Sequence, residues 1–296
     1  PICGVTGSAG KTTTTTLIGL MLKQGTGKPV YVGGNIGNPL IEIVDAIEPD
    51  AIVVLELSSF QLQMMHKSPH VGVLLNISPN HLDIHSSMEE YVEAKRGIFR
   101  AQHPGDHLVV NADDPGAQHA ARDYRFHRLS FSRTHEVEEG AFIESGQVVL
   151  RRPGTTIPVV PVSEVKLPGL HNQENLLAAF CASWLFGCTV EAMSRVAREV
   201  TGVEHRLELV RVLDGVADVN DSIATTPERT MAALATVQGP TVLIAGGYDK
   251  HLPFDTLAQR IVESNVVAVI TLGATAPKIE EAISHCLQHS ARTGPE

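Results

Sequence analysis

The sequence has 296 residues, which is enough for two domains of about 150 residues each. Hydrophobic residues make up 43% of it and charged residues 19%, so two ordinary cores can be filled. A net charge of −10 without a long basic run argues against a nucleic-acid-binding surface, although a few local cations can still hold a small anionic substrate.

The cysteines and the apolar runs indicate a cytoplasmic protein without membrane association. Four cysteines lie far apart in the sequence: Cys3, Cys181, Cys188 and Cys286. They form no CxxC pair, so we expect reduced core thiols rather than a zinc site or a disulfide framework. The most apolar stretch, residues 176–188, is too short to cross a bilayer, and no signal peptide pattern opens the chain. The chain begins with Pro1 and reaches a glycine-rich motif by residue 4, so we expect a fragment of a longer protein.

Short aliphatic runs alternate with helical patterns in the first part of the chain. Residues 51–57, 71–76 and 107–111 are nearly continuous runs of Val, Ile and Leu, which are typical of buried strands. Helical patterns occupy residues 88–100 and 113–122. This alternation predicts an α/β fold with a mostly parallel sheet and helices on both of its faces.

A different pattern interrupts the alternation at residues 130–162, where short runs, glycine turns and prolines predict a small antiparallel sheet. Helical patterns follow at residues 172–186 and 190–200, and then the strand–helix alternation begins again. We therefore predict a central domain with a phosphate loop at residues 1–202 and an incomplete, Rossmann-like C-terminal α/β domain at residues 203–296. The strands expected in the second domain are 216–220, 241–245 and 266–272.

The clearest motif is the glycine-rich stretch GVTGSAGKTT at residues 4–13, between an apolar run and a helical pattern. Its glycines let backbone N–H groups converge on phosphate oxygens, and the N-terminus of the helix adds positive potential. We expect Lys11 to reach the β- and γ-phosphates of a nucleotide and the Thr12 hydroxyl to bind Mg²⁺. The other expected nucleotide-binding residues are Gly7, Ser8, Gly10 and Thr13. A glycine turn before a threonine-rich helix would explain the glycines, but not a lysine followed by two hydroxyls.

Polar side chains follow two of the predicted strands. Glu56 ends one strand and precedes LSSFQL, and His81 lies in NISPNHLD after the next strand. Ligands of parallel α/β sheets bind beyond the carboxyl ends of the strands, where a carboxylate is well placed to hold Mg²⁺. A lone glutamate or histidine at a strand end is often structural. Two of them at neighbouring strand ends beside a phosphate loop favour a metal site.

Three of these motifs resemble the Mur ligase family. TGSAGKTT is similar to the phosphate loop shared with folylpolyglutamate synthases, although Ala9 replaces the usual Asn and Val5 breaks the strict GxxxxGK[ST] spacing. ELSSFQL and LNISPNHLD are similar to further family motifs. The resemblance implies ATP as cosubstrate and two Mg²⁺ ions, with Glu56 and His81 as metal ligands beside Thr12. It also gives Lys11 and His81 catalytic roles.

The resemblance assigns further roles in the first domain. Lys95, in YVEAKR, matches a lysine that is carbamylated in the family, where its carbamate supports the metal site and catalysis. This chemistry is plausible because a desolvated lysine has a lowered pKa and a neutral amine that can capture CO₂. Without the resemblance, an exposed helical lysine would be the simpler interpretation. Asn35, in GGNIG, is implied to approach the first substrate, and Ser58 to lie near its muramoyl group.

The segment LHNQEN begins a predicted helix, for which Asn172 is the expected N-cap. The resemblance places Asn172 and Asn175 near the adenine. HRLE is similar to a family motif in which Arg206 would reach the nucleotide, since arginine suits bidentate phosphate contacts, with a surface salt bridge as the alternative.

Two segments of the second domain complete the expected site. NDSIATTP is similar to NDSKATNP of the D-glutamate-adding branch of the family, and it implies nucleotide contacts by Asp221 and substrate contacts by Thr225. Ile223 replaces the common Lys in this motif and Thr226 the common Asn. Lys250, in GGYDK, is implied to pair with a D-glutamate carboxylate, with a solvated lysine as the alternative.

The resemblance covers residues 3 to about 275 and implies an activity. A cytoplasmic monomer would join D-glutamate to UDP-N-acetylmuramoyl-L-alanine through an acyl phosphate, in peptidoglycan precursor synthesis. The UDP-binding domain and a C-terminal segment of the family are missing, so we expect the fragment alone to be inactive. The alternatives are another Mur ligase or a folylpolyglutamate synthase, a P-loop ATPase or kinase, and a nucleotide-binding regulator without turnover.

Overall fold

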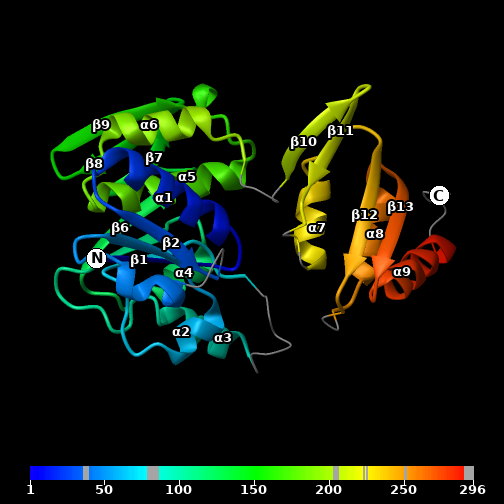
Figure 1. The fold of residues 1–296 in the computed structure, drawn as a ribbon, viewed down its shortest axis with the longest axis horizontal. Helices are drawn as coiled ribbons and strands as arrows, with labels where there is room; N and C mark the ends of the chain where they lie inside the picture. The colour runs from blue at the N-terminus through cyan, green and yellow to red at the C-terminus, as the bar shows by residue number, and fades with distance from the viewer. Residues whose placement is uncertain are drawn as a thin grey trace. The chain divides into compact units, whose positions relative to one another are not determined.

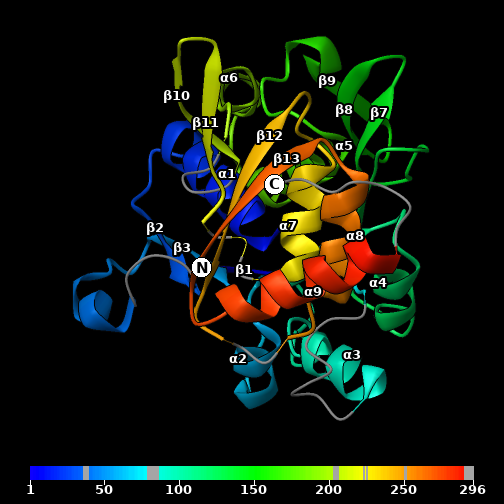
Figure 2. The ribbon, with the colours of Figure 1, turned by 90° about the vertical axis from the view of Figure 1, so that its right-hand side faces the viewer.

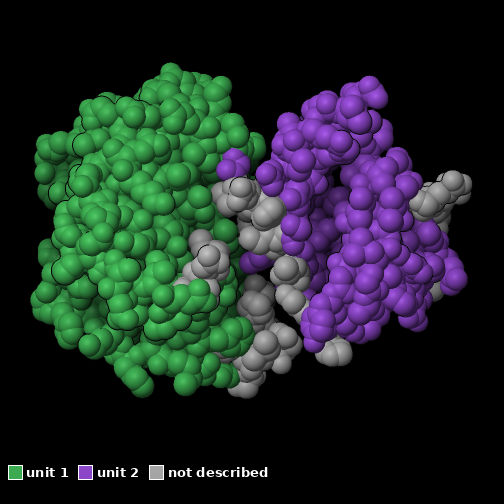
Figure 3. Space-filling model, viewed as in Figure 1, with its two compact units in different colours: residues 1–201 green, residues 202–296 purple. Residues whose placement is uncertain are grey.

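A computed structural model gives the fold of the chain. The described residues are 1–35, 40–78, 87–202, 207–222, 224, 226–249 and 252–289. The chain forms two compact units, residues 1–201 and residues 202–296, which are coloured separately in Figure 3. Each unit is described by itself.

A nine-stranded sheet runs through the first unit in the order β2-β3-β1-β4-β5-β6-β7-β8-β9 (Figure 1). Its strands are β1 (Ile2–Thr6), β2 (Val30–Gly34), β3 (Ile52–Glu56), β4 (Val71–Leu74), β5 (His107–Asn111), β6 (His127–Ser132), β7 (Gly140–Glu144), β8 (Gln147–Arg152) and β9 (Thr155–Pro161). In this order, each pair of neighbouring strands from β2 through β7 is parallel, whereas the pairs β7–β8 and β8–β9 are antiparallel. The predicted mostly parallel sheet and the antiparallel strands are thus confirmed. Pairing of β6 with β7 joins the two parts into one sheet.

Helices cover both faces of this sheet. They are α1 (Lys11–Gly25), α2 (Ser59–Met64), α3 (Met88–Arg96), α4 (Pro115–Ala120), α5 (Leu170–Leu185) and α6 (Val190–Glu199), with 3₁₀ turns η1 (Leu40–Ala46) and η2 (Val162–Glu164). Strand β5 shows why both faces are apolar: Val109 packs into the core with α1, α5 and α6, while Leu108 and Val110 pack into the core with α2, α3 and α4. Alternate residues point to opposite faces, so a strand covered on both sides is a continuous apolar run. Figure 1 shows α1, α5 and α6 on one side and α2 and α3 on the other.

Several helices of the first unit begin at a side-chain cap. Ser58 and Gln61 form a reciprocal capping box at α2, and Ser87, Asp114 and Thr189 each accept a backbone N–H at the start of α3, α4 and α6. Such caps satisfy N–H groups that have no partner within the helix. The expectation that Asn172 caps α5 is wrong. The helix begins earlier, at Leu170, after Gly169 with a φ of 96°.

The second unit repeats the strand–helix alternation on a smaller scale. Its elements are β10 (Glu208–Leu213), β11 (Val216–Asn220), α7 (Pro227–Leu234), β12 (Thr241–Gly247), α8 (Asp255–Glu263), β13 (Val266–Gly273) and α9 (Ala276–His289). Strands β10 and β11 form an antiparallel pair, and β12 and β13 a parallel pair. The three helices gather beside the β12–β13 pair (Figure 2). The predicted strands are confirmed, and β10 is an additional one.

The structure also bears on the predictions of reduced core thiols and of a chain without a membrane span. All four cysteines are free of disulfide bonds, and Cys3, Cys181 and Cys188 are buried. Burial raises the pKa of the Cys188 thiol to about 11, and also raises that of Cys3 and Cys181. These three therefore pack as neutral apolar side chains. Among the described residues, no helix is both long and apolar enough to span a membrane.

Candidate functional site

The glycine-rich loop connects β1 to α1, as the sequence predicts for a phosphate loop. Gly10 is the N-cap of α1 with a φ of 85°, a left-handed conformation that strains any residue with a side chain. A Cβ atom at Gly10 would lie only 2.2 Å from Oδ1 of Asn175. The first-turn N–H groups of α1 have no acceptor within the helix, so they are available to an anion. Lys11, the first helical residue, donates from Nζ to the Gly7 carbonyl at 2.9 Å and to that of Ser8 at 3.5 Å.

A buried carboxylate lies beside the start of this helix. Thr12 Oγ1 donates to Glu56 Oε2 at 2.8 Å, and Asn35 Nδ2 donates to Glu56 Oε1 at 3.1 Å. Glu56, at the end of β3, has an exposed fraction of 2% and forms no ion pair with any described residue. A buried carboxylate without a counter-charge is costly. A hydroxyl and a carboxylate oxygen are also the ligands that Mg²⁺ prefers, so the donor set fits a magnesium ion.

Lys95 approaches the loop from α3. Its side chain has an exposed fraction of 1%, and its Nζ donates to the Gly7 carbonyl at 3.0 Å and to Thr6 Oγ1 at 3.4 Å. Burial, and then the nearby charge of Lys11, lower the pKa of Lys95 well below its ordinary value. The ring of Tyr91, one helical turn away, lies 4.7 Å from Nζ. Two lysines thus converge on one backbone carbonyl, which favours a neutral amine at Lys95.

The N-terminal part of α5 meets the loop on another side. Thr14 Oγ1 donates to Asn175 Oδ1 at 3.3 Å, and Asn175 Nδ2 donates to Asn172 Oδ1 at 3.1 Å. Asn172 in turn donates to the Pro168 carbonyl at 2.6 Å. The structure therefore brings together Lys11, Thr12, Glu56, Lys95 and Asn175 from four separate elements of the first unit. Thr13 is buried, and its hydroxyl has no hydrogen-bond partner among the described residues.

Three residues that the sequence analysis did not single out hold the loop in place. The Asn76 side chain pairs with the backbone of Ala9, Ser78 exchanges hydrogen bonds with Ser8, and the Tyr91 hydroxyl lies 3.0 Å from Ser8 Oγ. Asn76 and Ser78 lie within the same motif as His81, and Tyr91 precedes Lys95 by four residues on one helix. That helical spacing was the signal that could have indicated Tyr91.

Other predicted site residues have structural partners or fall outside the described residues. Ser58 caps α2. Asp221 Oδ1, in the second unit, accepts the Leu207 N–H at 3.1 Å. Their proposed ligand contacts stay predictions. The predicted roles that fall on residues outside the described ranges are those of His81, Arg206, Thr225 and Lys250.

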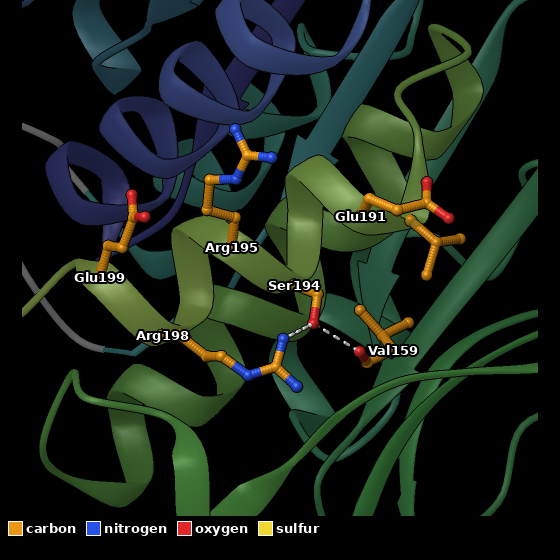
Figure 4. Close-up of a pocket in the computed structure, with 7 residues that line it drawn as sticks. Val159, Glu191, Ser194, Arg195, Arg198 and Glu199 are labelled. Atoms are coloured by element: carbon orange, nitrogen blue, oxygen red, sulfur yellow. Dashed lines mark hydrogen bonds between the residues drawn. The ribbon is translucent and has the colours of Figure 1, made fainter.

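A pocket of about 470 Å³ lies between α6 and β9 (Figure 4). Ser194 Oγ donates to the Val159 carbonyl at 2.8 Å, and Arg198 contacts both Ser194 and Glu164. These contacts attach α6 to its neighbours, and no phosphate-loop residue lines the pocket. Among the residues that the structure describes, no cluster of three His, Cys, Asp or Glu side chains could hold a metal ion. We therefore take the loop, not this pocket, as the candidate site.

The fold and the loop define an α/β protein of the phosphate-loop class. The Mur ligase middle domain matches residues 5–183 of the chain. The chain is 55% identical over 285 residues to a UDP-N-acetylmuramoylalanine--D-glutamate ligase of Symbiobacterium thermophilum, covering 96% of this chain and 62% of the relative. It is 46% identical over 292 residues to the ligase of that name from Acetivibrio thermocellus, covering 98% and 62%. The chain belongs to the Mur ligase family.

Solved structures agree with this fold. MurF from Acinetobacter baumannii superposes with a TM-score of 0.70 at 20% identity, covering 95% of this chain and 65% of that one. A pseudomurein peptide ligase type C from Methanothermus fervidus gives a TM-score of 0.68 at 19% identity, covering 100% and 75%. At these identities the likeness concerns the fold alone. The chain spans about 62% of the length of the curated relatives named above.

Proposed function

We propose that this chain carries the nucleotide-binding and amino-acid-binding parts of an ATP-dependent ligase that joins D-glutamate to UDP-N-acetylmuramoyl-L-alanine. The observation that carries the proposal is the hydrogen bond between Thr12 and the buried Glu56, at the start of the helix that Lys11 opens. Use of ATP and Mg²⁺ is a general property of the family. The names of the relatives support the choice of substrates.

In this proposal the residues of the loop act on the phosphates of ATP. Lys11 and the first-turn N–H groups of α1 bind the β- and γ-phosphates and offset the charge that develops during phosphoryl transfer. Thr12 and Glu56 would hold one Mg²⁺ ion, which supplies further positive charge there. The γ-phosphoryl group passes from ATP to an oxygen of the substrate carboxylate, which gives an acyl phosphate and leaves ADP. The neutral amine of D-glutamate attacks the carbonyl carbon of this acyl phosphate, inorganic phosphate leaves, and the nitrogen loses one proton as the amide forms.

Lys95 is proposed to be carbamylated and to support a second Mg²⁺ ion together with His81. The lowered pKa of Lys95 favours the neutral amine, whose lone pair forms an N–C bond to CO₂ as one proton is released to solvent. The product is a carboxylate at a position where the unmodified side chain is an uncharged amine. We expect a carbamate carbon signal in ¹³C NMR of the protein in ¹³C-bicarbonate, and its loss in Lys95→Met. A spectrum unchanged by this substitution would refute the modification.

The activity is tested by phosphate release from ATP by the full-length protein, with Lys11→Ala as the inactive control. We expect release only when UDP-N-acetylmuramoyl-L-alanine and D-glutamate are both present. Release with meso-diaminopimelate in place of D-glutamate would assign another ligase of the family. Phosphate release without any amino acid would favour an ATPase, and formation of ADP without phosphate release would favour a kinase. The proposal also places the protein in the cytoplasm as a monomer. Sedimentation of the full-length protein measures its oligomeric state.

A further inference from the structure

Asn76, just after the end of β4, forms hydrogen bonds to the phosphate loop that follows the neighbouring strand β1. It lies two residues beyond β4, and its Oδ1 accepts the N–H of Ala9 at 2.8 Å while its Nδ2 donates to the carbonyl of Ala9 at 3.1 Å. The Asn76 backbone carbonyl also accepts the N–H of Ser8 at 2.9 Å. One residue therefore makes three hydrogen bonds to two successive residues of a loop 67 positions earlier in the sequence.

This pairing needs the chemistry of a primary amide. An asparagine side chain carries a donor and an acceptor side by side, so it can satisfy the N–H and the carbonyl of one residue at once. Two bonds to the same residue fix the orientation of its peptide groups, which a single bond would leave free to rotate. Ala9 contributes only backbone atoms to the pairing. The residue that follows is Gly10, whose left-handed φ of 85° turns the chain into α1.

The segment that carries Asn76 is itself anchored to the sheet and to a helix. Leu75 N–H continues the parallel pairing by donating to the Thr6 carbonyl at 3.0 Å. The N–H of Ile77 donates to Asp114 Oδ1 at 3.1 Å, and the same oxygen caps α4. Asn76 is thus held from both sides, and it can transmit the rigidity of the sheet to a loop that contains two glycines.

We propose that Asn76 is a positioning residue for nucleotide binding, which fixes the Ala9 peptide so that the N–H groups of the first turn of α1 already face the phosphates before ATP arrives. This inference rests on the proposed nucleotide site. Holding a loop in its bound conformation increases affinity because less conformational entropy is lost on binding. The pairing also occupies the Ala9 N–H, which leaves the N–H groups from Gly10 onwards for the ligand.

The test compares Asn76→Ala and Asn76→Leu, whose side chain branches as that of asparagine does, with Gln102→Ala in the 296-residue chain. Gln102 is a suitable control because its side-chain amide also makes two hydrogen bonds to the backbone. It donates to the carbonyl of Pro69, before β4, at 2.8 Å and to that of His107, at the start of β5, at 2.9 Å. Calorimetry measures the Kd of an ATP analogue with an imido β,γ-bridge and Mg²⁺, and thermal melting reports stability. We expect about tenfold weaker binding for both Asn76 variants, or roughly 1.4 kcal/mol. Gln102→Ala should lower the melting temperature and leave the Kd within about twofold of the wild type.

Hydrogen exchange of the ligand-free chain gives a second readout. The amide of Ala9 should be protected in the wild type and in Gln102→Ala, and should exchange faster in both Asn76 variants. The inference is overturned if the Asn76 variants bind the analogue as tightly as the wild type or keep the protection of Ala9. A wild-type chain that binds no analogue would instead overturn the proposed function, because it would remove the nucleotide site itself.

Discussion

Lys95 and Glu56 are both almost completely buried, and neither forms an ion pair with a described residue. Among the described residues, Lys95 contacts a backbone carbonyl, a hydroxyl and a ring, and Glu56 accepts from one hydroxyl and one amide. Burial of charge without such a partner destabilises the folded state. These two residues therefore lower the stability of the folded chain, while they supply the carboxylate and the amine that the proposed site requires.

The first prediction concerns Lys95→Met in CO₂-free buffer. The folded-state pKa of Lys95 lies below its value in the unfolded chain, so below pH 10.5 the unfolded state binds more protons and stability falls as pH decreases towards the folded-state pKa. Methionine removes this loss, and we expect a gain of about 1 kcal/mol, or roughly 2–4 °C in Tm, at pH 7. Thermal melts check it, with the exposed Lys28→Met as control. An equal or lower Tm than that of the wild type would contradict it.

The second prediction concerns Glu56→Gln. The amide keeps the size of the side chain and an acceptor for Thr12 but loses the negative charge, so the affinity of the chain for Mg²⁺–nucleotide should fall at least about tenfold. The Tm should stay the same or rise, because the variant removes a buried charge that has no ion-pair partner among the described residues. Calorimetry with and without Mg²⁺ measures the effect, and Glu191→Gln on the exposed side of α6 is the control. Unchanged Mg²⁺ dependence would argue against a metal ligand at this position.

The element that organises the site is α1, whose two ends are both bordered by glycines of positive φ. Gly10 has a φ of 85° and faces Asn175, whereas Gly27, two residues beyond the last residue of α1, has a φ of 66°. A Cβ atom at Gly27 would meet nothing within 4 Å. The two positions share the backbone strain that a side chain would cause but differ in steric contact. Substitutions at these two glycines therefore separate the effect of backbone strain on stability from the effect of a steric clash.

The third prediction uses this pair. Gly27→Ala should cost about 1 kcal/mol of stability from backbone strain alone and leave nucleotide affinity unchanged. Gly10→Ala should cost more, because its Cβ would also displace the Asn175 side chain, and it should abolish binding of the ATP analogue. Urea unfolding and calorimetry measure the two effects. Equal loss of stability in both variants would show that the contact with Asn175 is unimportant.

The fourth prediction concerns the adjacent starts of β5 and β6, where the rings of His107 and His127 stack with centroids 5.2 Å apart. Burial, followed by the charges of His127 and Arg152, lowers the pKa of His107. As pH falls below about 6.5, the unfolded chain protonates at this histidine before the folded chain does, so stability decreases towards the folded-state pKa. Urea unfolding at pH values of about 7.5 and about 5.5, on either side of the ordinary histidine pKa, should show this loss, and it should be smaller in His107→Gln. An unchanged loss in that variant would assign it to other groups.

At the scale of the whole molecule, the two units differ in how much apolar surface they bury. The first unit has two large cores on either side of its sheet, while the described core of the second unit centres on Leu234, Leu257, Ile261 and Val266. Large apolar residues on the strands of the second unit are well exposed, such as Val216 at 65% and Ile244 at 64%. Burial of apolar area is the main stabilising term in folding, so the second unit should be the less stable one.

The fifth prediction follows from this difference. In the 296-residue chain, amides of β12 and β13 should exchange at least about tenfold faster than those of β1, β4 and β5, because opening of the second unit costs less free energy. Hydrogen exchange with mass spectrometry measures both sets in one sample. Equal protection of the two sets would mean that the units unfold together.

The sequence was sufficient where the signal is local. The phosphate loop is defined by glycines, a lysine and hydroxyls within residues 4–13, and the strand–helix alternation follows from periodicities of a few residues. Strand boundaries such as His107–Asn111 and Val216–Asn220 agree with the expected ranges. The cap of α5 was predicted wrongly, because a glycine of positive φ begins the helix earlier than the asparagine pattern indicates.

Only the tertiary structure decided which distant residues meet at the loop. The pairing of Asn76 with Ala9 spans 67 residues, that of Thr14 with Asn175 spans 161, and both depend on β4 lying next to β1 and on α5 lying against α1. The sequence determined the chemistry that this chain offers to a nucleotide, since residue types and local spacing suffice for that. The order of the strands determined how this chemistry is held in place, because contacts between distant segments arise from packing the whole sheet and leave no periodic pattern in the chain.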